Sequence, residues 1–376
     1  MDGRPGLLSG AALRHGGLVW CVLWAGQVAA QTPQTFDARP GDRVLQTQQL
    51  EGEAILALAD AALAGKAVPA DFRVEWQNEF LKAQHGTFVP FTLTVDLSTL
   101  HQPAALVYVR AVPLARDDGA GEPADTRGDG RNNAGDGFPV DAIFPVELRQ
   151  EPGRVARIRR GFSLVPGRYN VFVVLRERVE PAAREARPRA SVLRQPLTVP
   201  DFWSGELTTS SVILADRLDV LREPIAAEAL AERPYVIGHN DVTPAADRRF
   251  RNDEELIVIF LVYNPTVTAQ KKFDLQVEYH FFRKGASEGG SARQRNEPAH
   301  PPERAGERYF NHTEPQRFNP GTAGTLVDPA SGQPVVAGQG VPLAGFETGE
   351  YRLAIRVTDL LSGKIVDRDV LFTVGP

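Results

Sequence analysis

The stretch Gly167-Arg168-Tyr169-Asn170-Val171-Phe172-Val173 is echoed by Gly349-Glu350-Tyr351-Arg352-Leu353-Ala354-Ile355, and both follow the pattern Gly-x-Tyr-x-apolar-x-apolar. A glycine allows a tight turn, and the alternation after it sends every second side chain into a core. Each copy stands before a predicted hairpin near the end of its half of the chain. The echo therefore predicts two related β-rich domains.

Short runs in which apolar and polar residues alternate surround both copies. They occupy residues 91–95, 106–109 and 155–158 in the first half, and 273–279 and 351–374 in the second, where a strongly apolar run at 256–263 also predicts a strand. Clusters of Gly, Pro and Asp separate these runs, which is typical of antiparallel sandwiches. Helical segments do not alternate with the strands, which argues against a parallel sheet. Because a tyrosine often begins a late strand of immunoglobulin-like sandwiches, we expect a mainly β protein with two immunoglobulin-like antiparallel β-sandwich domains.

The first thirty residues differ from the rest of the chain. Arg4 and Arg14 form a short basic region, and residues 17–29 are almost entirely apolar. That apolar run is shorter than the roughly 20 residues that a membrane-spanning helix needs. It ends in small residues followed by a polar segment, which predicts a secretory signal peptide cleaved between Ala30 and Gln31. The alternative is an uncleaved N-terminal anchor. With cleavage, the protein is periplasmic or secreted.

Composition after cleavage excludes several kinds of site. Cys21 is the only cysteine and lies in the leader, so the mature chain lacks disulfides, thiolate catalysis and cysteine-bound metal. The residues before Cys21 are not the small ones that lipidation requires. Without Asp2, Arg4 and Arg14, the mature chain carries 40 basic and 46 acidic side chains, a net charge of −6. This weak acidity favours neither nucleic acid nor an anionic membrane as a partner, and no later segment is apolar enough to span a bilayer.

These patterns divide the chain into four parts. They are a signal peptide at 1–30, a flexible arm and short helix at 31–69, a first sandwich at 70–203 and a second sandwich at 204–376. The helix is expected at 50–65, because an apolar stripe recurs there at helical spacing and a glycine can end it. The stripe and its end consist of Ile55, Leu58, Ala59, Ala62, Leu63 and Gly65. We expect this helix to pack on the first sandwich, and the alternative is a docking helix for a partner.

Three further stretches interrupt the strand pattern. Residues 115–137 and 284–308 are rich in Gly, Pro and charge, and we expect both to be long exposed loops between strands. A short helical piece is expected at 224–232, ended by a proline.

Asp125, Asp129 and Asp136 are the strongest metal-ligand candidates, because they fit positions 1, 5 and 12 of a calcium-binding loop. Position 3 is Arg127, which places a cation where the ion needs an oxygen ligand. We therefore expect a solvated loop and no bound metal. The histidines are scattered, and no nucleophile elbow, phosphate loop or dinucleotide motif is present. The sequence predicts neither a catalytic residue nor a cofactor, and so no enzyme.

Two tryptophans, Trp76 and Trp203, remain after cleavage. Trp203 follows Phe202 at the predicted domain junction, and we expect this pair to wedge the domains together. The alternative is a platform on which Trp203 or Trp76 stacks against a sugar, so both are candidate ligand-binding residues.

Four segments around the predicted junction form a recognisable pattern: Leu164-Val165-Pro166-Gly167-Arg168-Tyr169, Ser191-Val192-Leu193, Leu197-Thr198-Val199-Pro200-Asp201-Phe202 and Ser210-Ser211-Val212-Ile213-Leu214. In this pattern the chain resembles the β-rich C-terminal region of von Willebrand A-related acidobacterial proteins over about residues 70–220. The resemblance implies a sandwich tail and a location in the cell envelope. The family's upstream A domain carries a D-x-S-x-S metal site. The segment Asp96-Leu97-Ser98-Thr99-Leu100 matches its first three positions and fails at the fifth, so metal-dependent adhesion is not carried over.

Three functional hypotheses follow. The leading one is an exported, non-catalytic envelope protein that acts through contacts with another envelope protein. The second is a carbohydrate-binding or adhesion module that uses Trp203 or Trp76. An unrecognised hydrolase ranks last, because no motif supports it.

Overall fold

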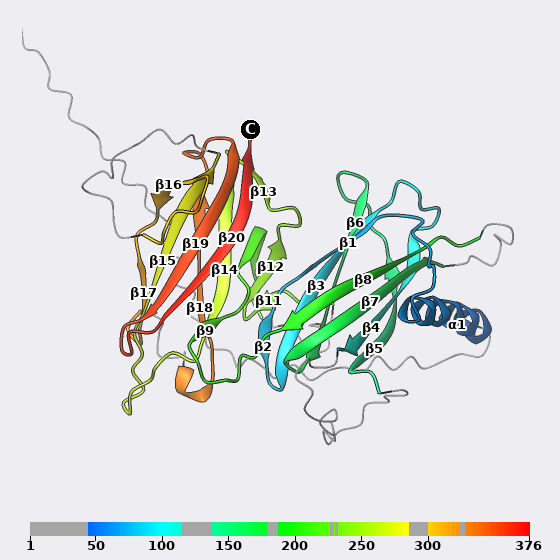
Figure 1. Cartoon of the computed structure of the whole chain (residues 1–376), viewed down its shortest axis with the longest axis horizontal. Helices are drawn as coiled ribbons and strands as arrows, with labels where there is room; N and C mark the ends of the chain where they lie inside the picture. The colour runs from blue at the N-terminus through cyan, green and yellow to red at the C-terminus, as the bar shows by residue number, and fades with distance from the viewer. Residues whose placement is uncertain are drawn as a thin grey trace, which may run out of the picture.

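The computed structural model describes residues 44–114, 137–178, 187–223, 225, 229, 232–285, 300–322 and 328–376. Within these ranges the chain forms two β-sandwiches that lie side by side, with an α-helix at one end (Figure 1). The predicted cleavage site at Ala30 and Gln31, the loop with Asp125, Asp129 and Asp136, and most of the helical piece at 224–232 lie outside the described residues. No helix in the described ranges has the length and apolar character to cross a bilayer.

The first sandwich consists of two four-stranded antiparallel sheets. In one sheet, β3 is central, with β6 on one side and β1 followed by β2 on the other. The second sheet has the order β5-β4-β7-β8. The strands are β1 (Val74–Asn78), β2 (Leu81–Ala83), β3 (Gly86–Asp96), β4 (Ala104–Pro113), β5 (Val140–Glu147), β6 (Val155–Leu164), β7 (Gly167–Glu177) and β8 (Ala190–Val199).

The second sandwich has two six-stranded sheets. One has the order β11-β12-β10-β14-β18, with β9 also paired to β14, and the other has the order β13-β20-β19-β15-β16, with β17 also paired to β15. The elements are β9 (Thr208–Thr209), β10 (Ile213–Val220), β11 (Val236–Ile237), β12 (Asn240–Pro244), β13 (Arg249–Arg251), β14 (Glu255–Tyr263), β15 (Leu275–Lys284), β16 (Glu307–His312), β17 (Gln316–Phe318), the 3-10 helix η2 (Pro329–Ser331), β18 (Val335–Pro342), β19 (Gly349–Asp359) and β20 (Ile365–Gly375).

Strand pairing repeats between the two sandwiches. The central strand β3 pairs with the interrupted strand β1/β2 and with β6, and β14 pairs in the same way with β9/β10 and with β18. In the opposite sheets, β4-β7-β8 corresponds to β15-β19-β20. The predicted fold class of two immunoglobulin-like sandwiches is confirmed. One pair departs from the antiparallel rule, because β13 runs parallel to β20.

The echoed Gly-x-Tyr pattern has the same geometry in both sandwiches. Tyr169 begins β7 and its hydroxyl donates a hydrogen bond to the Val165 carbonyl at 3.0 Å. Tyr351 begins β19 and donates to the Glu347 carbonyl at 2.7 Å. In each case the acceptor lies four residues upstream, and the ring packs in its own sandwich core. This contact fixes the turn into the strand, as in the tyrosine corner of immunoglobulin domains.

A buried carboxylate closes the other end of the same two strands. Glu177 and Asp359 each stand ten residues after the repeated glycine, and both are almost fully buried. Glu177 accepts backbone N–H groups from Gln102 at 3.2 Å and Arg189 at 2.9 Å. Asp359 accepts from the Thr266 N–H at 2.7 Å and from two N–H groups in its own hairpin turn. Each carboxylate thus ties the loop before a neighbouring strand to the strand end.

Strand β14 explains why the two sandwiches pack against each other. Its even-numbered side chains, such as Val258 and Phe260, enter the core of the second sandwich. Its odd-numbered ones, such as Ile259 and Leu261, pack on the first sandwich. The continuous apolar run at 256–263 exists because both faces of the strand are buried. The interface cluster contains Leu81, Ala83, Phe88, Phe202, Ile213, Ala215, Tyr235, Ile237, Val242, Ile259, Leu261 and Tyr263.

Helix α1 (Val44–Leu63) packs on the outer face of the sheet that contains β4 and β7. Ile55 and Ala59 are buried against that sheet, whereas Leu63 is 41% exposed and does not belong to the packed stripe. The helix ends as predicted, because Gly65 adopts a left-handed φ of 67° and the Lys66 N–H reaches back to the Ala61 carbonyl.

The expected start of this helix was wrong. It begins at Val44, six residues before the predicted start, within the segment expected to be a flexible arm. The segment from 44 to 49 is polar without periodicity, but glutamine is a good helix former.

The expectation of an exposed loop at 284–308 is confirmed for residues 302–306, which are exposed, but not for the two ends of that stretch. Residues 286–299 are not among those described, but residues 300–308 lie over the outer face of β15 and β19. Pro301 and Glu307 are buried there, and strand β16 already begins at Glu307. Residues 115–136 of the other predicted loop are outside the described ranges.

We predict that Asp359→Asn lowers the stability of the second sandwich by about 1 to 3 kcal/mol, because charge-assisted hydrogen bonds from three backbone N–H groups to a buried carboxylate are weakened. Burial acts to raise the pKa of Asp359, but hydrogen bonds from Thr266 and Ser362 outweigh it and hold the pKa below its usual value. The loss should therefore be largest at neutral pH and shrink in acid as the wild-type carboxylate becomes protonated.

Urea denaturation at pH 7 and pH 3 measures this effect. Asp253→Asn serves as the matched control, because Asp253 forms an exposed ion pair with Arg251 that solvent screens, so its loss should change stability little. Equal effects of the two substitutions would contradict the assigned role of Asp359.

Candidate functional site

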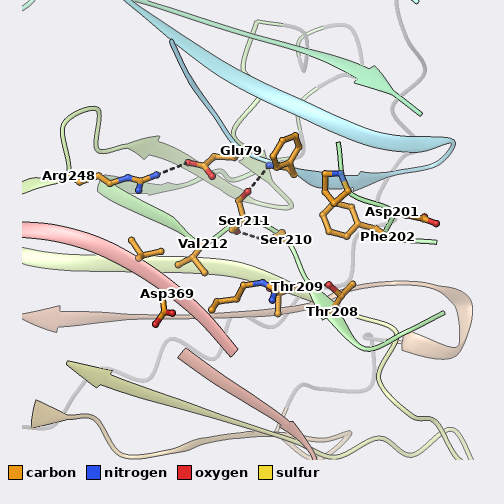
Figure 2. A pocket seen from close by; sticks show the side chains of 14 residues that line it. Glu79, Asp201, Phe202, Thr208, Thr209, Ser210, Ser211, Val212, Arg248 and Asp369 are labelled. Carbon is orange, nitrogen blue, oxygen red and sulfur yellow. Dashed lines mark hydrogen bonds and ion pairs between the residues drawn. The ribbon is translucent and has the colours of Figure 1, made fainter. Parts of the chain in front are cut away.

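A polar crevice of about 350 Å³ opens where the linker between the sandwiches meets strand β20 (Figure 2). Four segments contribute to its walls: the interruption between β1 and β2, the linker at 200–212, the loop before β13, and the middle of β20. Its lining residues are Glu79, Phe80, Pro200, Asp201, Phe202, Thr208, Thr209, Ser210, Ser211, Val212, Arg248, Arg368, Asp369 and Val370.

Reciprocal hydrogen bonds between the sandwiches form the back of the crevice. The Phe80 N–H donates to the Ser211 hydroxyl at 2.9 Å, and the Ser211 N–H donates to the Phe80 carbonyl at 3.0 Å. Both residues lie where a strand is interrupted, Phe80 between β1 and β2 and Ser211 between β9 and β10. Because an interrupted strand leaves backbone groups unpaired by its own sheet, the two interruptions satisfy each other.

Glu79 is a buried carboxyl group beside this contact. Burial raises its pKa to about 7, against the opposing effects of the Arg248 charge and of hydrogen bonds with Ser211 and Gln77. The Arg248 guanidinium lies 3.8 Å from a Glu79 oxygen, reaching across from the second sandwich (Figure 2). The charge of Glu79 therefore changes near neutral pH, at the contact between the domains.

Arg368 is the cation on the β20 side of the crevice. Its guanidinium donates to the Thr208 hydroxyl at 3.1 Å and to the Asp367 carbonyl at 3.0 Å. In the described part of the chain it forms no ion pair with a carboxylate. Thr209, next to Thr208, is 2% exposed, and its hydroxyl has no hydrogen-bond partner among the described residues. A guanidinium that lines a crevice without a carboxylate partner among the described residues can bind a carboxylate from outside them.

Ser210 and the remaining carboxylates of the crevice are engaged in hydrogen bonds and ion pairs within the protein. Ser210 is engaged with the backbone, since its hydroxyl donates to the Ser211 carbonyl at 2.8 Å and accepts from the Leu261 N–H at 2.9 Å. Among the described residues that line the crevice there is no histidine that could serve as a base for a serine nucleophile. Its remaining carboxylates have other partners, because Asp201 accepts the Trp203 N–H and Asp369 pairs with Arg352.

The two predicted ligand-binding tryptophans lie apart from each other. Trp76 stacks on Phe91 with ring centroids 4.3 Å apart and packs against the first core. Trp203 is 52% exposed, and its indole N–H donates to the Ala83 and Gly86 carbonyls. The expected wedge is therefore Phe202 alone, which is buried in the interface cluster. Trp203 instead anchors the linker on the hairpin between β2 and β3.

Three histidines that look scattered in the sequence come together on the outer face of the second sandwich. His300 stacks on Tyr309 with centroids 4.1 Å apart, and the ring of His280 lies 6.4 Å from that of His312. Both ring nitrogens of His280 are buried without a hydrogen-bond partner in the described part of the protein. Burial, together with smaller contributions from the neighbouring His312 and His300, lowers the pKa of His280 to about 4. No three side chains in the described ranges form a metal-binding group.

Sequence reasoning missed Glu79, Arg248 and Arg368. Arg368 carried a usable signal, because alternation along β20 places it on the same face as the core residues Val366 and Val370. No local sequence pattern indicates that Glu79 is buried, because its burial depends on a sandwich that begins about 130 residues later.

No family model matches this chain, and no curated protein matches it. Among solved structures, a mutant of Salmonella α-2-macroglobulin aligns over 82% of this chain at 11% identity with a TM-score of 0.20. Escherichia coli α-2-macroglobulin activated by porcine elastase aligns over 82% at 10% identity with a TM-score of 0.22. The chain spans only 15% and 24% of those two proteins. These values carry no argument about function, and the fold assignment rests on the sheet topology.

We predict that Glu79→Gln stabilises the protein at alkaline pH. The folded-state pKa of Glu79 is raised from 4.5 to about 7, so its contribution to stability is fully present below pH 4.5 and is lost as pH rises through 7. Wild type should lose up to about 3 kcal/mol from this group by pH 9, and the glutamine variant should lack this loss. Thermal melts from pH 5 to pH 9 test it.

The matched control for that experiment is Glu75→Gln, since Glu75 is an exposed residue of the adjoining strand β1. The prediction is wrong if both variants have the same pH dependence as wild type.

His280 is expected to act in the opposite direction. Its pKa is about 4 in the folded protein against 6.5 in an unfolded chain, so stability falls as pH drops from 6.5 toward 4. His280→Leu should remove about 1 to 3 kcal/mol of this acid sensitivity. Urea denaturation at pH 7 and pH 4.5 measures it, with the exposed His101→Leu as control. An unchanged acid sensitivity in His280→Leu would exclude His280 as the cause.

Proposed function

We propose that this protein is an exported, non-catalytic component of the bacterial cell envelope that acts through contacts with another envelope protein. The observation that carries the proposal is a set of exposed apolar side chains around the linker. Val165, Trp203, Leu360, Leu361 and Ile365 are 41% to 54% exposed. We call these five residues the linker surface.

The members of the linker surface are connected through short contacts. A Cβ atom built on Gly86 would lie 3.4 Å from the Val165 Cα, and the Gly86 carbonyl accepts the Trp203 indole N–H. Glu206, three residues after Trp203, pairs with Lys364 at 2.8 Å in the turn that holds Leu360 and Leu361. The β2–β3 turn and the β19–β20 turn both lie along the lower side of the molecule in the view of Figure 1. Exposed aromatic and aliphatic side chains with a polar surround are typical of protein interfaces.

Trp203 is less suited to stacking against a sugar. The Lys82 ammonium lies 4.1 Å from the centroid of its ring and covers one face. The other four residues of the linker surface are aliphatic, which favours a protein partner over a glycan. Export is supported by the leader pattern at residues 1–30.

A photoreactive amino acid in place of Trp203 or Leu361 tests the proposal in the native bacterium. Irradiation should yield one defined crosslinked envelope protein from both positions, because both side chains face the same partner. The purified adduct should contain a mature chain that begins at Gln31. Leu50, which is 67% exposed on helix α1, is the control position and should not yield this adduct.

Two results would contradict the proposal. The first is the same crosslinked background from all three positions, and the second is a chain retained in the cytoplasm with its leader uncut. Retention on a polysaccharide column that Trp203→Ala abolishes would instead support the glycan-binding alternative.

A further inference from the structure

One edge of the second sandwich is open to another strand. Strand β20 pairs with β19 along one side, whereas on its other side β13 covers only Thr373–Gly375 in parallel pairing. From Ile365 to Phe372 no described strand occupies that outer side. The Thr373 N–H donates outward to the Arg248 carbonyl at 2.9 Å. Because backbone direction alternates, the N–H groups of Asp367, Asp369 and Leu371 point the same way.

This edge lacks the residues that weaken other edge strands of the molecule. Prolines and glycines interrupt pairing at an edge. Such residues occur in edge strands β5, β6, β8 and β18, as Pro145, Gly161, Pro196, Gly338 and Gly340. The eight residues 365–372 of β20 contain neither. A further backbone can therefore pair along their full length.

The two carboxylates on the outer face of β20 are both paired with arginines of the neighbouring strand β19. Asp367 forms a bidentate pair with Arg356, at 2.8 and 3.0 Å. Asp369 pairs with Arg352 at 2.8 Å. On either side of these two carboxylates along the strand, Ile365 and Leu371 remain 54% and 46% exposed. On this face an added strand meets aliphatic side chains and no unbalanced charge.

The inner side of the edge carries one unbalanced charge, Arg368. Its side chain faces the crevice beside Thr208 and Thr209, and the described residues supply it with no carboxylate partner. An inward-pointing charge on an edge strand ordinarily discourages pairing with other chains, because it is buried when a strand is added. An acidic side chain on the added strand removes that cost, because its carboxylate can pair with the guanidinium.

We propose that the edge of β20 at residues 365–372 binds an extended segment of the partner protein as an added β-strand, and that this segment places a glutamate or aspartate against Arg368. The inference rests on the proposed function, since it names the kind of segment that the partner supplies. Backbone pairing provides the affinity, and Arg368 makes the pairing conditional on an acidic residue.

A synthetic peptide tests the proposal directly. The probe is fluorescein-labelled Thr-Val-Thr-Glu-Thr-Val-Thr, whose palindromic order allows either strand direction and whose Val-Glu-Val face can turn toward Arg368. Fluorescence anisotropy should show saturable binding to the mature protein. Replacing the peptide glutamate by glutamine, or Arg368 by glutamine, should weaken binding about tenfold or more, because a charge-assisted hydrogen bond is lost. Arg194→Gln, on edge strand β8, is the matched control and should leave binding unchanged.

Two further measurements identify the bound form as an added strand. Leu371→Pro removes an outward N–H while leaving the pairing with β19 in place, and it should weaken binding at least tenfold while the protein stays folded by circular dichroism. On binding, hydrogen exchange at the amides of Asp367, Asp369 and Leu371 should slow at least tenfold.

Two outcomes would overturn the proposal. One is the absence of saturable peptide binding up to 1 mM, roughly the weakest affinity of interest. The other is that Arg368→Gln binds the glutamine peptide more tightly than wild type does and binds the glutamate peptide as tightly as wild type does. Arg368 would then only prevent strand addition and would not select an acidic residue. If either occurs while crosslinking at Trp203 still recovers one partner, the proposed function stands and only the β20 site fails.

Discussion

The structure depends on strand β14 being buried on both of its faces. One face supplies Val258, Phe260 and Val262 to the core of the second sandwich, and the other supplies Ile259, Leu261 and Tyr263 to the contact with the first. A strand buried in this way cannot be exposed without losing apolar contacts on both sides. The two sandwiches are therefore held as a pair, and every feature at their junction is built around this strand.

The two sandwiches form hydrogen bonds with each other where a strand of each is interrupted. Phe80 and Ser211 satisfy each other across the junction, and this contact buries Glu79 beside them. Gly161 on β6 leaves room for the ring of Phe88, a member of the interface cluster, because a Cβ at position 161 would lie 2.3 Å from that ring. The crevice is the space that remains where the apolar contact ends and the linker turns toward β20. Its polar lining follows from unpaired strand ends at this place.

The features that repeat in both sandwiches stabilise each of them, whereas the features that differ between the sandwiches bear on the proposed partner binding. Tyr169 and Tyr351 fix equivalent turns, and Glu177 and Asp359 close equivalent strand ends. The outer faces differ: helix α1 covers the first sandwich, and residues 300–312 cover the second. Edge strand β8 contains Pro196, which has no N–H to donate to an added strand. Its counterpart β20 has a run of eight residues without proline or glycine. The repeated scaffold thus leaves one edge suited to a partner.

The sequence by itself determined the fold class, the internal repeat and the stop of helix α1 at Gly65. It could do so because alternation, turn glycines and capping are local properties of neighbouring residues. It also held a correct clue in the unbroken apolar run of β14. Only the tertiary structure decided that Glu79, Arg248 and Arg368 share a crevice, that Trp203 lies exposed, and that His280, His300 and His312 come together. These groups lie far apart in the chain, and packing between sheets and sandwiches, which no local pattern records, brings them together.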